Sequence, residues 1–487
     1  NWGKDVFVPM EYVIGGVEYV GKGWMMLMNS LAAGRSISLP ANGCGIAKLC
    51  ALTTGAYGYV RTQFNVPIGR FEGVQEAVAR IGGNAYLMDA ARVMTAGAVD
   101  LGEKPSVVSA IAKYHLTERG RMVINDAMDV HGGKGICMGP NNYLAYAYQQ
   151  TPIAITVEGA NILTRSMIIF GQGAIRAHPY VLREIEATRE LDAEKALADF
   201  DAAFFGHVSF IAGNVARAFW MGLTGARFTG APGDAETRGY YRQLTRLSSA
   251  FALMADVAML TLGGSLKFRE RLSARLGDIL SMLYLASAVL KRYEDDGRPR
   301  EDLPLVHWAV QDCLWRVEDA FYGLFKNMPN RVMAWVMRSL IFPYIYPYGR
   351  EFLPPNDDLG QQVVALMLVP GPTRDRLIAG VFVPKDQNDP VAVLEAALRA
   401  VVAAAPVEAK IRAAEKSGAV EGRFPDEVRD AAVAKGVITQ DESGLLDRAA
   451  ELRRKVIMVD DFPKDLGRTE IYQTTQPVTF EALRKRA

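Results

Sequence analysis

Long runs rich in Ala, Met and Leu fill most of residues 21–175, and this pattern constrains the fold more than any other feature of the chain. Such residues favour long helices, whereas Gly and Pro tend to end them. The runs are punctuated at Gly69, Gly102, Pro105, Gly132–Gly133 and Pro152. The spacing of these breaks predicts about four long helices packed as a bundle.

A further break at residues 171–179, which contains glycines and a proline, predicts the end of the bundle. The sequence beyond it is helical again. One buried helix face is indicated by leucines at helical spacing, namely Leu276, Leu280, Leu283 and Leu290. Asp389 followed by Pro390 predicts a helix start, because the carboxylate can cap free backbone N–H groups and proline fits the first turn. We therefore expect a mostly α chain.

The composition argues against nucleic acid and against a metal site. Lys and Arg number 55 and Asp and Glu number 54, so the formal net charge is +1. Nucleic-acid-binding domains usually carry a basic excess. No metal-ligand spacing is formed by the four cysteines, Cys44, Cys50, Cys137 and Cys313. So few cysteines in a long chain indicate a reducing compartment, and we expect a cytoplasmic location.

Leu247 to Leu266 is the best candidate for a membrane span, but Asp256 lies near its middle. A charge at mid-bilayer is costly, so a buried helix is the favoured interpretation. Peripheral contact with the inner membrane stays open, since arginines and lysines flank the segment. The chain begins at Asn1 without a signal-peptide pattern, which indicates a fragment or a processed chain.

A carboxylate in an apolar setting is the first candidate for catalysis. Glu158 lies in residues 156–161, directly after the apolar residues 152–155. Apolar surroundings remove water from a carboxylate, and a partly desolvated carboxylate suits a general base. The alternative is an acid at a helix N-terminus, stabilised by the helix dipole. On the pattern alone, this structural alternative is favoured.

Two other segments are candidates for holding phosphate. In residues 131–135 (HGGKG), successive glycines let a ligand approach backbone N–H groups that could hold a pyrophosphate. No clear strand precedes this segment, so it does not indicate a Rossmann fold, and a plain loop is the alternative. Arg61, close to Phe64, could clamp a phosphate or stack on a ring, or be a solvated side chain at a helix end. Arg35 is equally ambiguous in isolation.

The order of these elements resembles the acyl-CoA dehydrogenases, and most closely the bacterial FadE-type long-chain enzymes. Members of this family carry Gly-Lys-Gly ahead of a helix with an Arg, matched here by residues 21–23 and Arg35. An Arg-x-x-Phe element before Pro-Ile is matched by residues 61–68, and a Gly-Gly-x-Gly loop by residues 132–135. A Glu-Gly pair that opens the last bundle helix is matched by Glu158–Gly159.

The resemblance implies three parts. Residues 1–20 would end a middle β-domain, and residues 21–175 would form the four-helix-bundle C-terminal domain. Residues 180–487 would form the additional, mainly helical C-terminal domain of FadE-type proteins. An N-terminal half that covers the flavin would be absent or supplied by another chain.

The resemblance also implies an activity and the residues that perform it. Glu158 would be the catalytic base in FAD-dependent α,β-dehydrogenation of acyl-CoA, of long acyl chains, to trans-2-enoyl-CoA in fatty acid β-oxidation. Arg35 and Gly159 would lie near the substrate. Contacts to FAD would come from Arg61, Thr62, Gln63, Phe64, Asp129, Val130, His131, Gly132, Gly133 and Ala160. Asp129 and Ala160 depart from the residues that are usual in the family at those positions.

The implied partners are an electron-transfer flavoprotein-like acceptor and a second copy of the chain in a dimer. An acyl-CoA oxidase, which shares the bundle and the base, is one alternative function. A non-catalytic helical scaffold of the same fold is another.

Overall fold

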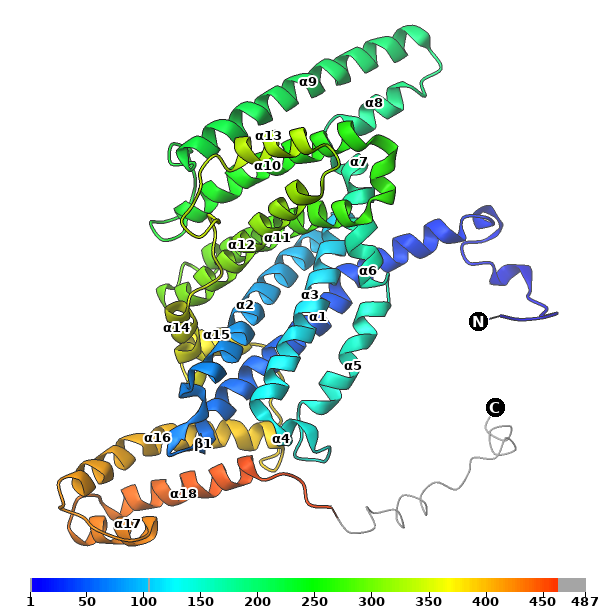
Figure 1. Cartoon of the computed structure of the whole chain (residues 1–487). Helices are drawn as coiled ribbons and strands as arrows, with labels where there is room; N and C mark the ends of the chain where they lie inside the picture. Colours follow the sequence, from blue (N-terminus) through cyan, green and yellow to red (C-terminus); the bar gives the residue numbers. More distant parts are fainter. Residues whose placement is uncertain (1, 104–105, 463–487) are drawn as a thin grey trace. The chain divides into compact units, whose positions relative to one another are not determined.

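The computed structural model describes residues 2–103 and 106–462, and these are almost entirely helical (Figure 1). In these ranges the only strands are β1 (Thr62–Gln63) and β2 (Val66–Pro67), which form an antiparallel hairpin. Thr62 pairs with Pro67, and Gln63 pairs with Val66. The prediction of a mostly α chain is confirmed.

The first part of the chain forms the long helices that the Ala-rich runs predict. They are α1 (Gly23–Val60), α2 (Glu72–Asp100), α3 (Ser106–His131), α5 (Ala145–Thr156) and the π-helix η4 (Thr164–Gln172). Two short helices precede them, η1 (Met10–Tyr12) and η2 (Val17–Tyr19), and three lie between them, η3 (Ile68–Arg70), α4 (Gly133–Ile136) and α6 (Asn161–Leu163).

The next part is a second series of helices. They are α7 (Gly173–Ala177), α8 (Val181–Ala187), α9 (Ala193–Thr224), α10 (Arg238–Leu262), η5 (Gly263–Phe268), α11 (Glu270–Asp295), η6 (Arg300–Asp302), α12 (Leu303–Asn327), α13 (Arg331–Ile341), α14 (Asp357–Leu368) and α15 (Pro372–Ile378). All four leucines predicted to line one face lie on α11, and three of them, Leu276, Leu283 and Leu290, are buried.

Two compact units share the chain. The first comprises residues 1–130 and 146–382, and the second comprises residues 131–145 and 383–487. The expected division near residues 175–180 is not tested by this grouping and stays a prediction.

The second unit is built around α16 (Pro390–Lys416), α17 (Pro425–Ala434) and α18 (Gln440–Ile457). The start of α16 at Pro390 confirms the predicted cap, because the Asp389 carboxylate accepts from the N–H groups of Val391 and Ala392. Its apolar core is a buried cluster, namely Val407, Ala414, Val420, Val428, Ala432 and Ile438.

Glycines allow the helices of the first unit to approach closely. A Cβ on Gly43 of α1 would lie 2.4 Å from the carbonyl oxygen of Leu116 on α3. A Cβ on Gly83 of α2 would lie 1.9 Å from the ring of Trp308 on α12. Since real Cβ atoms do not approach so closely, these glycines permit the observed helix packing.

Three helical stretches are long and apolar enough to cross a membrane: Arg238–Phe268, Glu270–Asp295 and Pro390–Lys416. The count rises to four if the bent pair Ala145–Thr156 and Asn161–Gly171 is taken as one span. This finding concerns length and composition only. In α10 the predicted burial is observed around Asp256, where Leu253, Met254 and Val257 are also buried.

We expect Gly83→Ala to lower the free energy of unfolding by about 1–3 kcal/mol, because the added methyl group collides with Trp308. Gly97→Ala is a matched control on the same helix, since a Cβ there meets nothing within 4 Å. It should leave stability unchanged or raise it by up to about 1 kcal/mol. Urea unfolding followed by circular dichroism measures both, and equal stabilities of the two variants would contradict the packing argument.

Candidate active site

Glu158 lies on a turn between α5 and α6 with an unusual backbone. Its φ is +54°, and that of Gly159 is +101°. A residue with a Cβ rarely adopts a positive φ, and the conformation persists only where neighbouring groups hold it. The contacts that hold this turn therefore bear directly on the position of the candidate base.

Three cationic or polar side chains hold the turn by its main-chain carbonyls. Arg35 Nε donates to the carbonyl oxygen of Glu158 at 3.1 Å. Lys113 Nζ donates to the carbonyl oxygen of Gly159 at 2.7 Å, and Thr164 Oγ1 donates to the same oxygen at 3.3 Å. Helices α1, α3 and η4 thus all fix one turn.

Asn161 extends this anchor into α3. Its Oδ1 accepts from Lys113 Nζ at 2.6 Å. Its Nδ2 donates to Thr117 Oγ1 at 2.9 Å and to Glu118 Oε1 at 2.8 Å. The side chain is buried and its amide is satisfied on both sides, so the start of α6 cannot shift without breaking several hydrogen bonds.

The Glu158 carboxylate itself is left free to act. In the described part of the chain, its Oε2 is buried and has no hydrogen-bond partner. A Cβ on Gly34 would lie 2.5 Å from Oε1, so the missing side chain on α1 leaves the space in which the carboxylate lies. A carboxylate that is positioned through its backbone and carries an unused oxygen can accept a proton from a substrate.

Lys113 is a buried cation beside this turn. Burial, and after it the nearby Arg35, lower the pKa of its ammonium group from 10.5 to about 8, although Glu158 and Glu118 act in the opposite direction. Below that pH the charged Lys113 places positive charge next to the carbonyl groups of the turn.

The structure brings together three of the residues predicted for the site. Arg35, Glu158 and Gly159 meet at one turn, since Arg35 bonds to Glu158 and its Nη2 would lie 3.7 Å from a Cβ on Gly159. Ala160, predicted to contact the cofactor, is an exposed residue at the N-cap of α6 and offers no capping side chain.

A separate group of predicted site residues directly follows the C-terminal end of α1, namely Arg61, Thr62, Gln63 and Phe64. With a rise of about 1.5 Å per residue, Arg61 lies about 39 Å along the helix from Arg35. Phe64 is 90% exposed and has a φ of +51°, and Asn65 has a φ of +61°. Positive φ at both central residues is the geometry of a tight type I′ hairpin turn, which here displays an aromatic ring to solvent.

The third predicted group lies at the end of α3. Asp129 and Val130 are in its last turn, and Asp129 is exposed. His131, Gly132 and Gly133 belong to the other compact unit. There the His131 Nε2 lies 2.9 Å from the hydroxyl of Tyr143.

The backbone of this glycine turn is open. Gly132 has a φ of +56°, and a Cβ on Gly132 or Gly133 would meet nothing within 4 Å. Asn142 braces the turn by donating to the carbonyl oxygens of Gly135 and Cys137 at 2.8 and 3.0 Å. An uncovered and braced glycine turn fits the close approach of a diphosphate.

Sequence reasoning missed Lys113, Asn161 and Gly34. Asn161 stands in the same segment as Glu158, so its polar side chain in the first turn of a helix was the available signal. Lys113 follows residues 107–112 on α3, which are apolar apart from Ser109, and a charge after such a stretch hinted at a buried partner without identifying it. Gly34 offered no signal, because its role depends on a contact with a residue far along the chain.

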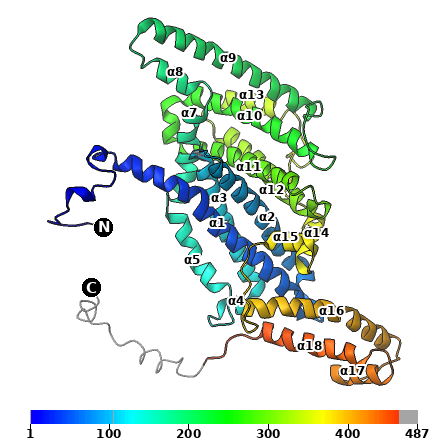
Figure 2. The ribbon, with the colours of Figure 1, turned by 180° about the vertical axis from the view of Figure 1, so that it is seen from behind.

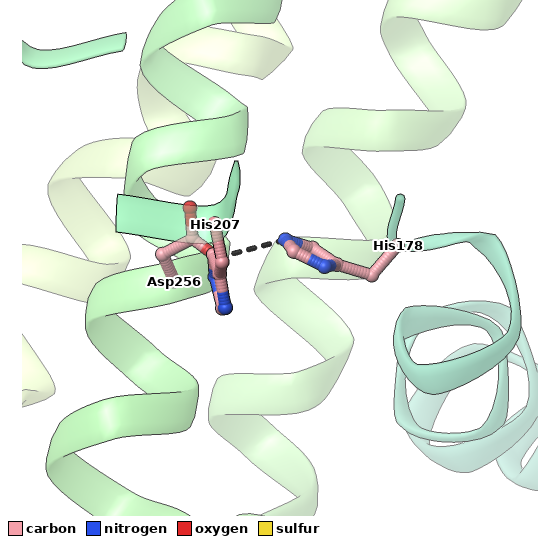
Figure 3. A group of neighbouring side chains, drawn as sticks. All are labelled: His178, His207 and Asp256. Carbon is pink, nitrogen blue, oxygen red and sulfur yellow. Dashed lines mark hydrogen bonds and ion pairs between the residues drawn. The ribbon is translucent and has the colours of Figure 1, made fainter. Parts of the chain in front are cut away.

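A second cluster of titratable side chains joins His178, His207 and Asp256 (Figure 3). His178 Nε2 lies 2.9 Å from Asp256 Oδ1, and His207 Nε2 lies 3.3 Å from the same oxygen. The other ring nitrogen of His207, Nδ1, lies 2.8 Å from Glu184 Oε1. Two imidazoles and a carboxylate within 4.8 Å of one another resemble a metal-binding set.

The hydrogen bonds of His178 favour a structural role for this cluster. Its Nδ1 accepts from the backbone N–H groups of Tyr180 and Val181, both at 3.1 Å. Nδ1 therefore carries no proton, and Nε2 of the neutral ring must carry it. Nε2 lies 2.9 Å from Asp256 Oδ1, but among the described residues it makes no hydrogen bond of good geometry. A metal-binding nitrogen instead needs a free lone pair, with the other ring nitrogen donating. The cluster joins the start of α8 to α9 and α10.

Comparison with known proteins gives the following similarities. Residues 175–462 match the family model described as "Acyl-CoA dehydrogenase, C-terminal, bacterial type", and residues 21–171 match "Acyl-CoA dehydrogenase, C-terminal domain". Over 337 residues the chain is 24% identical to "Probable acyl-CoA dehydrogenase FadE10" of Mycobacterium bovis. This match covers 66% of this chain and 50% of that protein. A 54-residue stretch is 52% identical to "Protein HemX" of Proteus mirabilis, covering 11% of this chain and 32% of that protein.

A solved structure shares the fold. The acyl-CoA dehydrogenase of Bacillus anthracis, complexed with FAD, superposes with a TM-score of 0.54 at 18% identity, covering 72% of this chain and 57% of that one. The chain spans at most half the length of the two curated relatives described above.

Lys113 should impose a pH dependence on stability. Its pKa is about 8 in the folded protein and 10.5 in the unfolded chain, so the unfolded chain binds more protons between these values. The free energy of unfolding should therefore rise by up to about 3 kcal/mol from pH 8 to pH 10.5 through this group. Lys113→Met should remove that rise.

Urea unfolding at pH 7.5 and pH 10 measures this difference for the wild type and the variant. Lys291→Met is the control, since Lys291 is exposed and pairs only with Asp295 one turn away in the described structure. It should retain the wild-type pH dependence. A Lys113→Met variant with the same rise as the wild type would show that Lys113 is not the responsible group.

Proposed function

Because the chain belongs to the acyl-CoA dehydrogenase family, we propose that it is the C-terminal part of an FAD-dependent acyl-CoA dehydrogenase with Glu158 as its catalytic base. This proposal rests on the hydrogen bonds and the carboxylate position of the Glu158 turn. Its backbone is bonded to Arg35 and Lys113, while one carboxylate oxygen is left without a partner in the described structure. A fixed backbone and a free oxygen are what proton abstraction from a thioester requires.

The proposed reaction is α,β-dehydrogenation of an acyl-CoA to the trans-2-enoyl-CoA. Glu158 takes the α-proton, and the turn keeps its carboxylate at a constant position while it does so. The cofactor supplies the acceptor for the hydride that leaves the β-carbon. The preference for long acyl chains and the role in β-oxidation rest on the resemblance to FadE-type enzymes.

Residues of two copies would contact each flavin. Arg61–Phe64 lie about 39 Å from Arg35 along α1, a distance greater than the length of one FAD molecule. Glu158 and the Arg61–Phe64 hairpin of the same chain would therefore serve different flavins. This separation supports a homodimer in which the hairpin contacts the nucleotide part of the partner's cofactor.

Other partners follow from the family. An N-terminal half, absent from this chain or carried by another one, would cover the flavin ring. An electron-transfer flavoprotein-like acceptor would reoxidise the enzyme, and reoxidation by oxygen with release of hydrogen peroxide would instead identify an acyl-CoA oxidase.

The test uses the complete enzyme, with the N-terminal half present. Adding a long-chain acyl-CoA should bleach the flavin absorbance of the wild type. Glu158→Gln should bind flavin equally but bleach at least about a thousandfold more slowly, since it removes the base and keeps the shape. Glu118→Gln, on α3 and hydrogen-bonded to Asn161, is the control and should bleach much faster than Glu158→Gln. Bleaching of Glu158→Gln at the wild-type rate would exclude Glu158 as the base.

We also propose that the enzyme is cytoplasmic and lies against the inner membrane through α9, α13 and the loop after α9. These helices pack together in an outer layer with α10 (Figures 1 and 2). Large apolar side chains are exposed there, namely Phe205, Phe219, Trp220, Phe228, Val332 and Trp335.

The charges of this layer favour an anionic lipid surface as its occupant. Within this layer, residues 202–233 and 331–341 carry the exposed rings and contain Arg217, Arg227, Arg331 and Arg338 but no Asp or Glu. The acids of α9 and of the loop after it lie outside these ranges, namely Glu194, Asp199, Asp201, Asp234 and Glu236. Exposed aromatic rings with arginines and without acids are typical of helices that lie at the membrane interface.

Sedimentation with phosphatidylglycerol vesicles tests this proposal. The wild type should pellet with the vesicles, and replacing Phe219 and Trp220 together by Ser should reduce the pelleted fraction at least about fivefold by removing buried apolar area. Leu101→Ser, at an exposed site after α2, is the control and should pellet like the wild type. No pelleting of the wild type, or equal pelleting of all three proteins, would contradict the proposal.

A further inference from the structure

A large cavity in the first unit lies apart from the Glu158 turn and has no role in the proposed reaction. Its volume is about 1020 Å³, and it lies between α3, α11 and α12, with Arg350 from the segment after α13. Cavities of about 300–1,000 Å³ are typical of small-molecule sites. Six basic side chains line it, namely Arg119, Arg165, Arg275, Arg316, Lys326 and Arg350.

The carboxylates around the cavity do not balance these six cations. Three acids line it, Glu118, Asp278 and Asp319. A fourth, the buried Asp312, lies behind the wall and is shared, since both Arg119 and Arg316 bond to it at 2.9 Å. The local surplus of positive charge contrasts with a net charge of +1 for the whole chain.

Three of these cations, Arg275, Arg350 and Lys326, have N–H donors that are not hydrogen-bonded to an acid among the described residues. The bond recorded for Arg275 runs from Nη1 to the main-chain oxygen of Arg271 at 3.2 Å. Arg350 bonds to Asp319 through Nη2, whereas its Nη1 is buried and has no hydrogen-bond partner in the described ranges. Lys326 is exposed and pairs with no acid among the residues that the structure describes. Unused guanidinium and ammonium donors around one cavity are suited to an anion.

His115 is a further polar side chain in the wall of this cavity. Its side chain lines the cavity, is only 7% exposed, and leaves Nε2 without a partner in the part of the chain that is described. The pKa of its imidazole lies well below the ordinary value, first because of burial and then because of Arg119, Arg316 and Arg165. A neutral His115 adds a polar contact without adding charge.

We infer that this cavity binds an oligophosphate group, such as that of inorganic pyrophosphate or of a nucleoside diphosphate. Arginine forms paired hydrogen bonds with phosphate oxygens, and Arg275, Lys326 and Arg350 all line one cavity. A single monovalent anion would leave part of the surplus charge unbalanced. The site does not depend on the proposed dehydrogenase activity, because neither Glu158 nor Arg35 lines it.

Isothermal titration calorimetry of the purified chain with inorganic pyrophosphate, in magnesium-free buffer, tests the inference. The wild type should bind saturably, with one site per chain and an affinity that falls as salt is added. Replacing Arg275 and Lys326 together by Gln should weaken binding at least about tenfold, since two charge-assisted contacts are lost. Arg271→Gln, on the same helix but outside the cavity lining, is the control and should bind like the wild type.

Further measurements separate the outcomes. The single variant Lys326→Gln changes an exposed side chain and should weaken binding even if the double variant unfolds. Tighter binding of ADP than of pyrophosphate would identify a nucleotide ligand. Equal affinity for ADP and pyrophosphate would show that the phosphate groups alone are recognised. Both results support the site. No saturable binding of either probe by the wild type at millimolar concentrations, or equal binding by all variants, would overturn the inference.

Discussion

The buried polar row on α3 is the constraint on which the rest of the first unit depends. Lys113 and Arg119 are charged side chains buried on this helix, and a buried charge is tolerated only when it is paired or hydrogen-bonded. Lys113 is satisfied by the Glu158 turn. Arg119 is satisfied by Asn84 on α2 and by Asp312 on α12. One helix thus ties the candidate catalytic turn to the helices of the second series.

Local sequence signals predicted the helices but not the contacts between them. The helices predicted from Ala-rich runs and Gly or Pro breaks are determined by residues that lie close together in the sequence. The same holds for the cap of α16 by Asp389, which is confirmed. Gly83 and Trp308 meet across more than two hundred residues, and no local pattern encodes such an approach. The same limit applies to the site. Glu158 was found through its family motif, whereas Lys113 acts on it from another helix.

The charge within the apolar helix α10 also becomes clear only from contacts with other helices. Asp256 lies within α10, which is long and apolar enough to cross a membrane. From the sequence, the charge indicated only that a membrane span was unfavourable. In the structure, Asp256 is buried beside His178 and His207, which reach it from the segment before α8 and from α9. The carboxylate therefore specifies which segments pack against α10, a choice that apolar side chains alone leave open.

Glu118 connects the candidate catalytic turn with the cationic cavity. Its Oε1 accepts from Asn161, its Oε2 accepts from Arg121, and the residue lines the cavity wall. An anion in the cavity would face this carboxylate and raise the electrostatic cost of keeping it charged. The turn would still be held, because Lys113 and Thr117 also bond to Asn161. The catalytic backbone is thus anchored redundantly, and the cavity can change its occupancy without displacing Glu158.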